Sequence, residues 1–103
     1  MYLTVFRNRK RAGFDAAAYA ADAARMEELA AKAPGFRSIK TFHAADGEVV
    51  TISEWDSRAA AKAWGHHPDH LAVQAKGRTD YYESYTSITM DGPSVRSFER
   101  GVE

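Results

Sequence analysis

The sequence predicts one α+β domain with a ferredoxin-like β-α-β-β-α-β order, in which the helices cover one face of an antiparallel sheet. Four segments rich in aromatic and β-branched residues are typical of strands, alanine-rich segments have helical spacing, and glycine and proline mark the turns. At 103 residues the chain is long enough for one hydrophobic core. We therefore expect a single domain over residues 1–103, with a core of about residues 2–90 and a tail over 91–103.

The first strand and the first helix follow from local signals. Tyr2 to Arg9 has the composition of a strand. Asp15 can cap a helix that runs to about Lys32, because its carboxylate can accept hydrogen bonds from free backbone N–H groups. Pro34 and Gly35 then end this helix. The apolar residues of the helix form one stripe at helical spacing: Tyr19, Ala23, Met26, Leu29 and Ala30.

A hairpin and a second helix follow in the middle of the chain. The turn dipeptide Asp46-Gly47 predicts that Phe36 to His43 pairs with Glu48 to Trp55. Ser57 can cap the next helix, which is expected to run from Arg58 to about His66.

The last third of the chain predicts a short helix, a strand and a tail. Pro68 suits the first turn of a helix, since its missing N–H would have no partner there, and this helix runs toward Gly77 or a little beyond. Tyr82 to Met90 is the fourth strand, and Gly92 with Pro93 breaks it. The tail from Ser94 either adds a short edge strand through Val95 and Phe98 or trails along the surface.

The strand patterns predict a dimer. A sheet with helices on one face and water on the other should alternate apolar and polar residues. Here apolar residues occupy both faces, and two helices can cover only one. A second copy packed sheet to sheet would bury the other face in an isologous dimer. The apolar residues are Tyr2 and Phe6 against Leu3 and Val5 in the first strand, and Val49 and Trp55 against Val50 and Ile52 in the third.

Composition narrows the class of function. The 14 basic and 14 acidic residues balance, so the chain carries no electrostatic signature for nucleic acid or an anionic membrane. The absence of cysteine excludes disulfides, thiolate metal sites and thiol nucleophiles. The N-terminus lacks the pattern of a secretory signal, and no window approaches the roughly 20 apolar residues of a membrane helix. We therefore expect a cytoplasmic protein.

Three histidines stand together after the second helix. His66 and His70 are four residues apart, and His67 and His70 are three apart, so either pair could share a helical face. Two imidazoles can hold zinc or iron, but such a site needs a third or fourth ligand, and only Asp69 is adjacent. We therefore predict no metal site. His67 would instead cap the following helix, His66 would face solvent and His70 would point at a pocket.

Aromatic and polar residues around these histidines are further candidates. Trp55 is expected in the core, and Trp64 either lines a pocket or belongs to the core. The phenols after the third helix bind or orient a ligand rather than ionise, because their ordinary pKa is about 10. Asn8 and His43 lie late in strands and could add polar contacts. The remaining candidates are the phenols Tyr81, Tyr82 and Tyr85 and a basic run expected to be solvated, Arg7, Arg9, Lys10 and Arg11.

Several of these segments together resemble the antibiotic biosynthesis monooxygenase (ABM) domain family. The resemblance is carried by SEWDS, then AW, HPDH, Q, GR and YESY, with PGF after the first helix and DGE in the hairpin, and it covers roughly residues 2 to 98. It implies a ferredoxin-like, dimeric α+β barrel.

Two branches of that family imply different sites. One oxidises polycyclic aromatic polyketides with O₂ and uses neither metal nor flavin. Its helix carries an Asn, a Trp and a Tyr, where this chain has Ala60, Trp64 and His70. The other branch degrades heme with a strand Asn, the same Trp and a proximal His. Asn8 and Trp64 match these, while the proximal position falls near Gln74, with His70 one turn earlier as a substitute.

The resulting hypothesis is a homodimeric, cofactor-independent monooxygenase that oxidises a small quinol or polyketide-like aromatic substrate with O₂. An imidazole has an ordinary pKa of about 6.5, which suits a base. The alternatives are a heme-degrading enzyme and a non-catalytic domain that binds a small molecule. The predicted catalytic residues are Trp64, His70 and Asn8, and the predicted substrate-binding residues are Trp64, His67, Tyr82 and Phe42.

Overall fold

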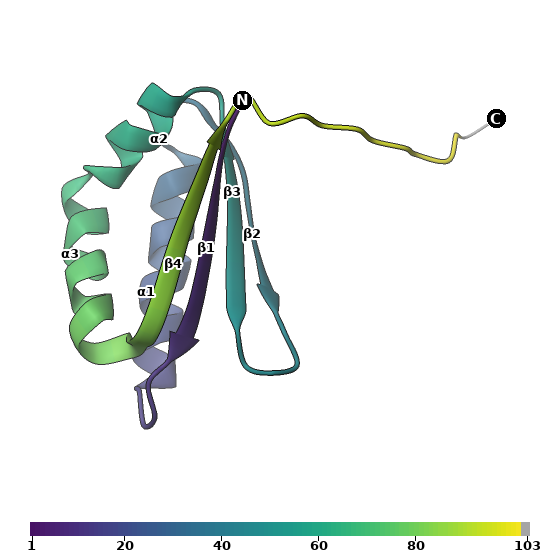
Figure 1. The fold of residues 1–103 in the computed structure, drawn as a ribbon. Coiled ribbons are helices and arrows are strands. Elements are labelled where there is room, and N and C mark those ends of the chain that lie inside the picture. Colours follow the sequence, from purple (N-terminus) through teal and green to yellow (C-terminus); the bar gives the residue numbers. More distant parts are fainter. Residues whose placement is uncertain (102–103) are drawn as a thin grey trace.

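The computed structural model describes residues 1–101, and it confirms the ferredoxin-like α+β arrangement. The strands form one antiparallel sheet in the order β2-β3-β1-β4, and the helices lie on one side of it (Figure 1). The elements are β1 (Tyr2–Lys10), α1 (Ala16–Ala31), β2 (Phe36–His43), β3 (Val49–Trp55), α2 (Arg58–Gly65), α3 (Pro68–Lys76), the π-helical turn η1 (Gly77–Tyr81) and β4 (Tyr82–Asp91).

The caps and turns expected from the sequence form as predicted. The Asp15 carboxylate accepts a hydrogen bond from the Ala18 backbone N–H at 3.0 Å, and the Ser57 hydroxyl accepts one from Ala60 N–H at 3.1 Å. Gly47 has φ +93° in the hairpin turn, a conformation that residues with a Cβ rarely adopt. The starts of α1 and α2 and the hairpin are therefore confirmed.

The core lies at one end of the layer between helices and sheet. Tyr2 and Phe36 both pair with Trp55 in the sheet register, so the three side chains share the helix-facing side. Trp55 is 2% exposed, and its indole N–H donates to the Ser53 hydroxyl at 3.2 Å. Further residues pack on this cluster from α1, the following loop and α2: Ala30, Ala33, Ala60, Ala61 and Trp64.

The rest of the helix-facing side is covered less well. Thr4 and Phe6 in β1 and Ser53 in β3 are only partly buried, although they face the helices. In β4 the residue paired with Thr4, Thr89, is exposed, and so is Ser87 beside Phe6. Helix α3 therefore leaves the β4 edge of this layer open.

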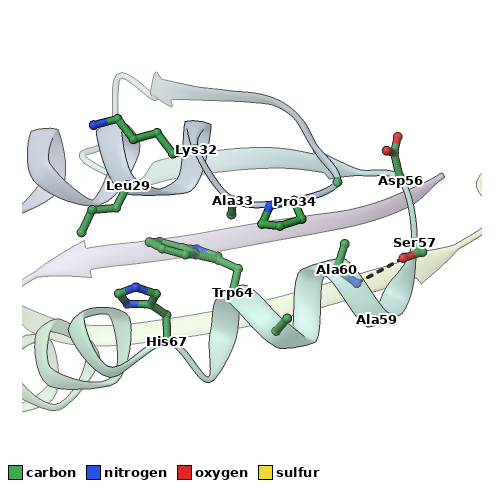
Figure 2. Close-up of a pocket in the computed structure, with 12 residues that line it drawn as sticks. Leu29, Lys32, Ala33, Pro34, Asp56, Ser57, Ala59, Ala60, Trp64 and His67 are labelled. Atoms are coloured by element: carbon green, nitrogen blue, oxygen red, sulfur yellow. Dashed lines mark hydrogen bonds between the residues drawn. The ribbon is translucent and has the colours of Figure 1, made fainter.

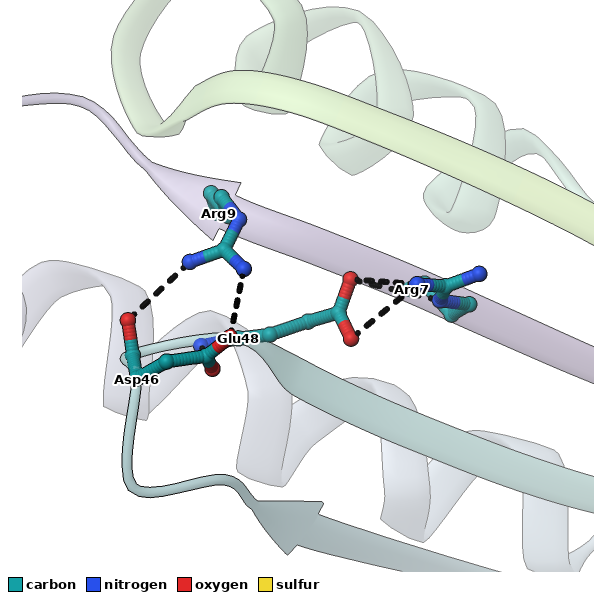
Figure 3. A network of polar contacts seen from close by, with 4 residues as sticks. All are labelled: Arg7, Arg9, Asp46 and Glu48. Carbon is teal, nitrogen blue, oxygen red and sulfur yellow. Dashed lines mark hydrogen bonds and ion pairs between the residues drawn. The ribbon is translucent and has the colours of Figure 1, made fainter.

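The opposite face of the sheet carries no helix in the described part of the chain (Figure 1). Two ion pairs flank it near the hairpin: Arg7 binds Glu48 at 3.0 Å, and Arg9 binds Asp46 at 2.9 Å (Figure 3). The Glu48 backbone N–H and the Arg9 guanidinium hold the pKa of Asp46 below its ordinary value. We call the apolar part the open face; it consists of Leu3, Val5, Phe42, Val50, Ile52, Ile88 and Met90.

The turn η1 was not expected from the sequence. Its first residue, Gly77, is buried, and a Cβ there would lie 2.6 Å from Cε2 of Tyr82, so only glycine lets the Tyr82 ring pack this closely. The Tyr81 hydroxyl donates to the Asp22 carboxylate at 2.6 Å, and Lys76 Nζ lies 3.0 Å from the same oxygen. These contacts fix the turn against α1 and thereby fix where β4 begins.

The C-terminal tail behaves differently from both expectations. Gly92 turns the chain with φ +62°, and Pro93 offers no N–H to a neighbouring strand. The residues that follow form no strand and extend away from the body, with Val95 63% and Phe98 83% exposed (Figure 1). Positions 102–103 of the expected tail lie outside the described residues. Within residues 1–101, no helix is long and apolar enough to cross a membrane.

Replacing Gly35 with alanine should destabilise the domain more than the same change at Gly13. Both have positive φ, +81° and +74°, which costs about 1–2 kcal/mol for a residue with a Cβ. Only at Gly35 would the new Cβ collide, at 2.5 Å, with Cβ of Ala60 in α2. We expect an additional loss of about 1–3 kcal/mol in the free energy of unfolding, measured by urea denaturation. Equal losses for the two variants would contradict this packing of α2 on the loop.

Candidate functional site

An open groove of about 720 Å³ lies between the end of α1 and helix α2 (Figure 2). Gly35 and Ala60 both line it and pack closely on each other, since a Cβ on Gly35 would lie 2.5 Å from that of Ala60. Trp64 points across the groove toward α1, and its ring stacks at 6.5 Å on Trp55 of the core. We call this cavity the Trp64 groove; its lining includes Leu29, Ala33, Gly35, Ala60, Trp64 and His67.

Two histidines flank the Trp64 ring, and their backbone contacts give them opposite tautomers. The ring centroids of His67 and His70 lie 5.5 and 5.1 Å from that of Trp64. Nδ1 of His67 accepts a hydrogen bond from Asp69 N–H at 3.1 Å, so in the neutral ring the proton sits on Nε2. Nδ1 of His70 lies 3.3 Å from the Gly65 carbonyl, which can only accept, so Nε2 of the neutral His70 ring carries the lone pair.

The surroundings of His70 favour its neutral form. Burial lowers its pKa from the ordinary value, and the nearby His67 adds to this effect, while the hydrogen bond to Gly65 opposes it. A neutral imidazole with a free Nε2 can accept a proton. His70 contacts the Trp64 ring but does not itself line the Trp64 groove, whereas His67 does both.

The other polar residues of this region have structural roles. His67 caps α3, and His66 is exposed at the end of α2, as the sequence predicted. Asp69 pairs with Arg25 of α1 at 3.2 Å. Among residues 1–101, no group of three or more His, Cys, Asp or Glu side chains is arranged to hold a metal ion.

A second polar cluster lies at the other end of the layer. Asn8 is 2% exposed, and its Oδ1 accepts a hydrogen bond from Lys10 Nζ. The ammonium lies 4.2 Å from the centroid of the Tyr19 ring and 5.3 Å from that of Tyr82. We call these four residues the lysine cluster. Nδ2 of Asn8 has no hydrogen-bond partner, which ordinarily costs about 1–3 kcal/mol in a folded protein.

Burial shifts the titration of the lysine cluster. It lowers the pKa of the Lys10 ammonium and raises the pKa of the Tyr82 phenol well above its ordinary value, with further increases from the neighbouring tyrosines. It also raises the pKa of Tyr19. The low-dielectric surroundings therefore disfavour charge on all three groups.

The structure divides the predicted site residues into three places. Trp64, His67 and His70 lie together. Asn8 is six residues along β1 from Tyr2, the residue that pairs with Trp55. At about 3.3 Å per residue this is about 20 Å, and Tyr82 shares that distant end with Asn8.

Phe42 lies in a third place. It pairs with Val50, which also pairs with Arg7, so it stands on the open face and is 46% exposed.

Lys10 and Tyr19 were not among the predicted site residues. Lys10 belongs to a basic run expected to be solvated; Arg7, Arg9 and Arg11 are exposed, but Lys10 is partly buried. Strand parity could have identified it, because Lys10 shares the helix-facing side with Phe6 and Asn8.

Several known proteins are similar to this chain. It is 46% identical over 67 residues to the uncharacterized protein YqjZ of Bacillus subtilis, a match that covers 65% of this chain but only 59% of that relative. The structure of Rv0793 from Mycobacterium tuberculosis superposes with a TM-score of 0.80 at 21% identity, covering 93% of this chain and 98% of the other.

SnoaB, a cofactor-independent oxygenase from Streptomyces nogalater, superposes with a TM-score of 0.75 at 18% identity, covering 91% and 94% of the two chains. At these identities the two structural matches show the fold alone.

The family assignment rests on a sequence model of the whole family. The sequence model of the antibiotic biosynthesis monooxygenase family matches residues 1–76, from β1 to the end of α3, and so includes Trp64 and both flanking histidines. Because this is well over half of the 103 residues, the chain belongs to the antibiotic biosynthesis monooxygenase family.

Proposed function

We propose that this protein is a monooxygenase that oxidises a small quinol or polyketide-like aromatic substrate with O₂ beside Trp64. The observation that carries the proposal is the placement of two histidines of opposite tautomer against one indole ring, next to an apolar groove. The ring offers a surface on which a flat substrate can stack, one histidine offers a donor and the other an acceptor. Family membership and the likeness to an oxygenase support the reaction class.

The proposed reaction uses a general base and a hydrogen-bond donor, and none of its steps uses a metal. Nε2 of His70 would take the acidic proton of the substrate, and Nε2–H of His67 would stabilise the negative oxygen that results. The electron-rich anion would then reduce O₂ itself and form a C–O bond. In a substrate with a methylene group, such as anthrone, loss of water leaves a carbonyl, so that the methylene group and O₂ become a carbonyl group and H₂O. In a quinol, a ring C–H and O₂ give a hydroxyquinone and H₂O, and neither reaction needs an external reductant.

The proposal keeps part of the set predicted from the sequence. Trp64 and His70 retain their roles and His67 becomes a hydrogen-bond donor. Asn8 and Tyr82, at the other end of β1 from Tyr2, and Phe42 on the open face have no part in this centre.

The heme alternative fits the structure less well. It needs a strand Asn and the helix Trp in one pocket, whereas Asn8 lies six residues along β1 from Tyr2, the strand residue beside the Trp55 ring on which Trp64 stacks. Gln74, at the position of the proximal ligand, is exposed. These two observations weigh against the residue set that the resemblance implied for heme.

We further propose that the protein works as an isologous homodimer through the open face. Phe42, Ile88 and Met90 on this face are 42–46% exposed, although they are large and apolar. The charges of Arg7 and Arg9 beside them are balanced by the ion pairs of Figure 3, so these two arginines add no net charge to the face.

Replacing His70 with glutamine should lower kcat/KM for an aromatic substrate by about 100-fold or more, because the proton acceptor is lost. The measurement is oxygen uptake with anthrone and with a naphthohydroquinone, corrected for spontaneous oxidation. The matched control is His66→Gln, which changes an exposed histidine of the same run and should leave the rate within about twofold. If no substrate of this class is consumed by the unchanged protein, the proposal fails in favour of a non-catalytic binding domain.

The pH dependence of kcat/KM for the same reaction should report the protonation of His70. The base acts when neutral, so activity falls as the pH drops through its pKa, which burial moves below the ordinary value of about 6.5. We expect the acid limb of kcat/KM to have its midpoint below that value and to disappear in His70→Gln. An acid limb that survives in the variant would assign the base to another group.

A hemin titration separates the heme alternative from the proposed reaction. Since Gln74 at the proximal position is exposed and is a poor axial ligand, we expect no stoichiometric Soret shift when hemin is added to the protein. A shift that bleaches under air with ascorbate, and that is lost in His70→Gln but kept in His66→Gln, would establish heme degradation instead.

Phe42→Glu should convert the dimer to a monomer, because it would bury charges at the interface. The matched control is Leu71→Glu in α3, since both side chains are 46% exposed and only Phe42 lies on the open face. Molar mass by light scattering after gel filtration gives the answer. An unchanged protein that is monomeric, or a Leu71→Glu variant that dissociates equally, would contradict the proposed interface.

A further inference from the structure

We propose that Lys32 determines the specificity of the Trp64 groove and that the substrate is an aromatic carboxylic acid whose carboxylate pairs with Lys32. The inference rests on the proposed oxidation and deepens it, because it names the chemical class of the molecule that is oxidised. It is carried by a weakly partnered cation that lines a largely apolar cavity beside the Trp64 ring.

The first step is the place of Lys32 in the groove. Lys32 lines the groove from the C-cap position of α1, on the side toward which Trp64 points (Figure 2). Leu29 stands one turn earlier on the same face of the helix and also lines the groove. A lysine can lay its alkyl stem along such apolar surface and keep its ammonium at the edge. The ammonium is therefore within reach of a substituent on a ring that stacks on Trp64.

The second step is the weakness of the contact that Lys32 makes within the protein. Among residues 1–101, Lys32 forms an ion pair only with Glu28, and its Nζ lies 3.7 Å from the carboxylate, too far for a hydrogen bond. The two side chains are 73% and 71% exposed. An exposed pair of this kind contributes little to stability, so Lys32 can turn to an anionic ligand at small cost.

The third step is that the other charges around the groove already have close partners. Asp56 lies toward the other end of the groove from Lys32, and its carboxylate accepts a hydrogen bond from Arg37 Nε at 2.6 Å (Figure 2). Arg25 of α1 binds Asp69 at 3.2 Å. Among the described residues that line the groove, Lys32 is the one lysine or arginine. A single carboxylate therefore matches the available charge better than a phosphate dianion does.

The fourth step is the position of Lys32 relative to the histidines. Figure 2 shows His67 on the opposite side of the Trp64 ring from Lys32. A stacked substrate can thus direct a hydroxyl group toward the histidines while a carboxylate elsewhere on its ring reaches Lys32. Two anchors fix the orientation of the reacting group. The carboxylate takes no part in the redox step, in which a ring C–H and O₂ give a hydroxyquinone and H₂O.

The test compares 1,4-dihydroxy-2-naphthoate with 1,4-dihydroxynaphthalene, two quinols that differ only in the carboxylate. Each is titrated into the full chain under nitrogen, so that neither is oxidised, and binding is followed by the two tryptophan indole N–H signals in ¹H–¹⁵N spectra. We expect the larger shift at Trp64 and about fivefold tighter binding of the acid, as an exposed ion pair gives. Salt should remove this preference. Equal affinities in low salt would overturn the proposal.

Two substitutions test whether Lys32 supplies the charge. Lys32→Met should remove the preference for the acid and leave the affinity for the neutral quinol within about twofold. The matched control is Lys62→Met, since Lys62 is an exposed lysine of α2 that does not line the groove. A preference that survives in Lys32→Met, or that disappears in Lys62→Met, would overturn the role of Lys32.

Oxygen uptake separates this inference from the proposed oxidation. Lys32→Met should raise KM for the acid by about fivefold and leave kcat unchanged, because the ion pair holds substrate and transition state alike. If the unchanged protein consumes both quinols with the same KM, the oxidation stands and the role of Lys32 is wrong. If the acid binds through Lys32 but neither quinol is consumed, the class of ligand stands and the oxidation is wrong.

Discussion

The burial of Trp55 is the constraint on which the rest of the structure depends. Its indole is the largest fully buried side chain of the described residues, and its N–H is satisfied within the sheet by Ser53. Tyr2 and Phe36 pair with Trp55, which fixes the register of β1 and β2. Ala30 and Trp64 pack on the same cluster, so one side chain holds both α1 and α2 against the sheet. Away from this cluster the helices cover the sheet sparsely.

That uneven coverage explains why the polar residues gather in two places. Near Trp55 the helices approach closely, and Trp64 with its two histidines lies where α2 gives way to α3. At the far end the layer is held by the Tyr81–Asp22–Lys76 contacts of the π-helical turn together with contacts between aromatic rings. A buried amide and a lysine can lie there because aromatic rings, not aliphatic side chains, surround them.

The sequence predicted the fold well because its signals are local. Asp15, Ser57 and Gly47 each act within a few residues, so caps and turns could be located without knowledge of the tertiary structure. The π-helical turn at Gly77 has no such local signal, since it depends on the approach of the Tyr82 ring. The tail does not form the strand that was one of the two expectations. Pro93 has no N–H to donate, and no described strand pairs with the tail.

The candidate site was predicted only in part, for a geometrical reason. Alternation along a strand shows which face a residue occupies, and Asn8 does share the helix-facing side with Trp64. Alternation does not show where along the sheet a helix residue lies. For Trp64 this position is set by its packing on Trp55. The tautomers of the two histidines could not be predicted from the sequence either, since they depend on the backbone groups of Gly65 and Asp69.

The cap of α3 links the state of the site to the integrity of a helix. His67 can hold the first turn only while its Nδ1 keeps a lone pair for the Asp69 N–H. Without that acceptor the Asp69 N–H would lose its partner, and the start of α3 would be held less firmly, together with His70 one turn later. One side chain therefore caps a helix, lines the Trp64 groove and helps to position the neighbouring base, so a substitution at His67 would alter all three features at once.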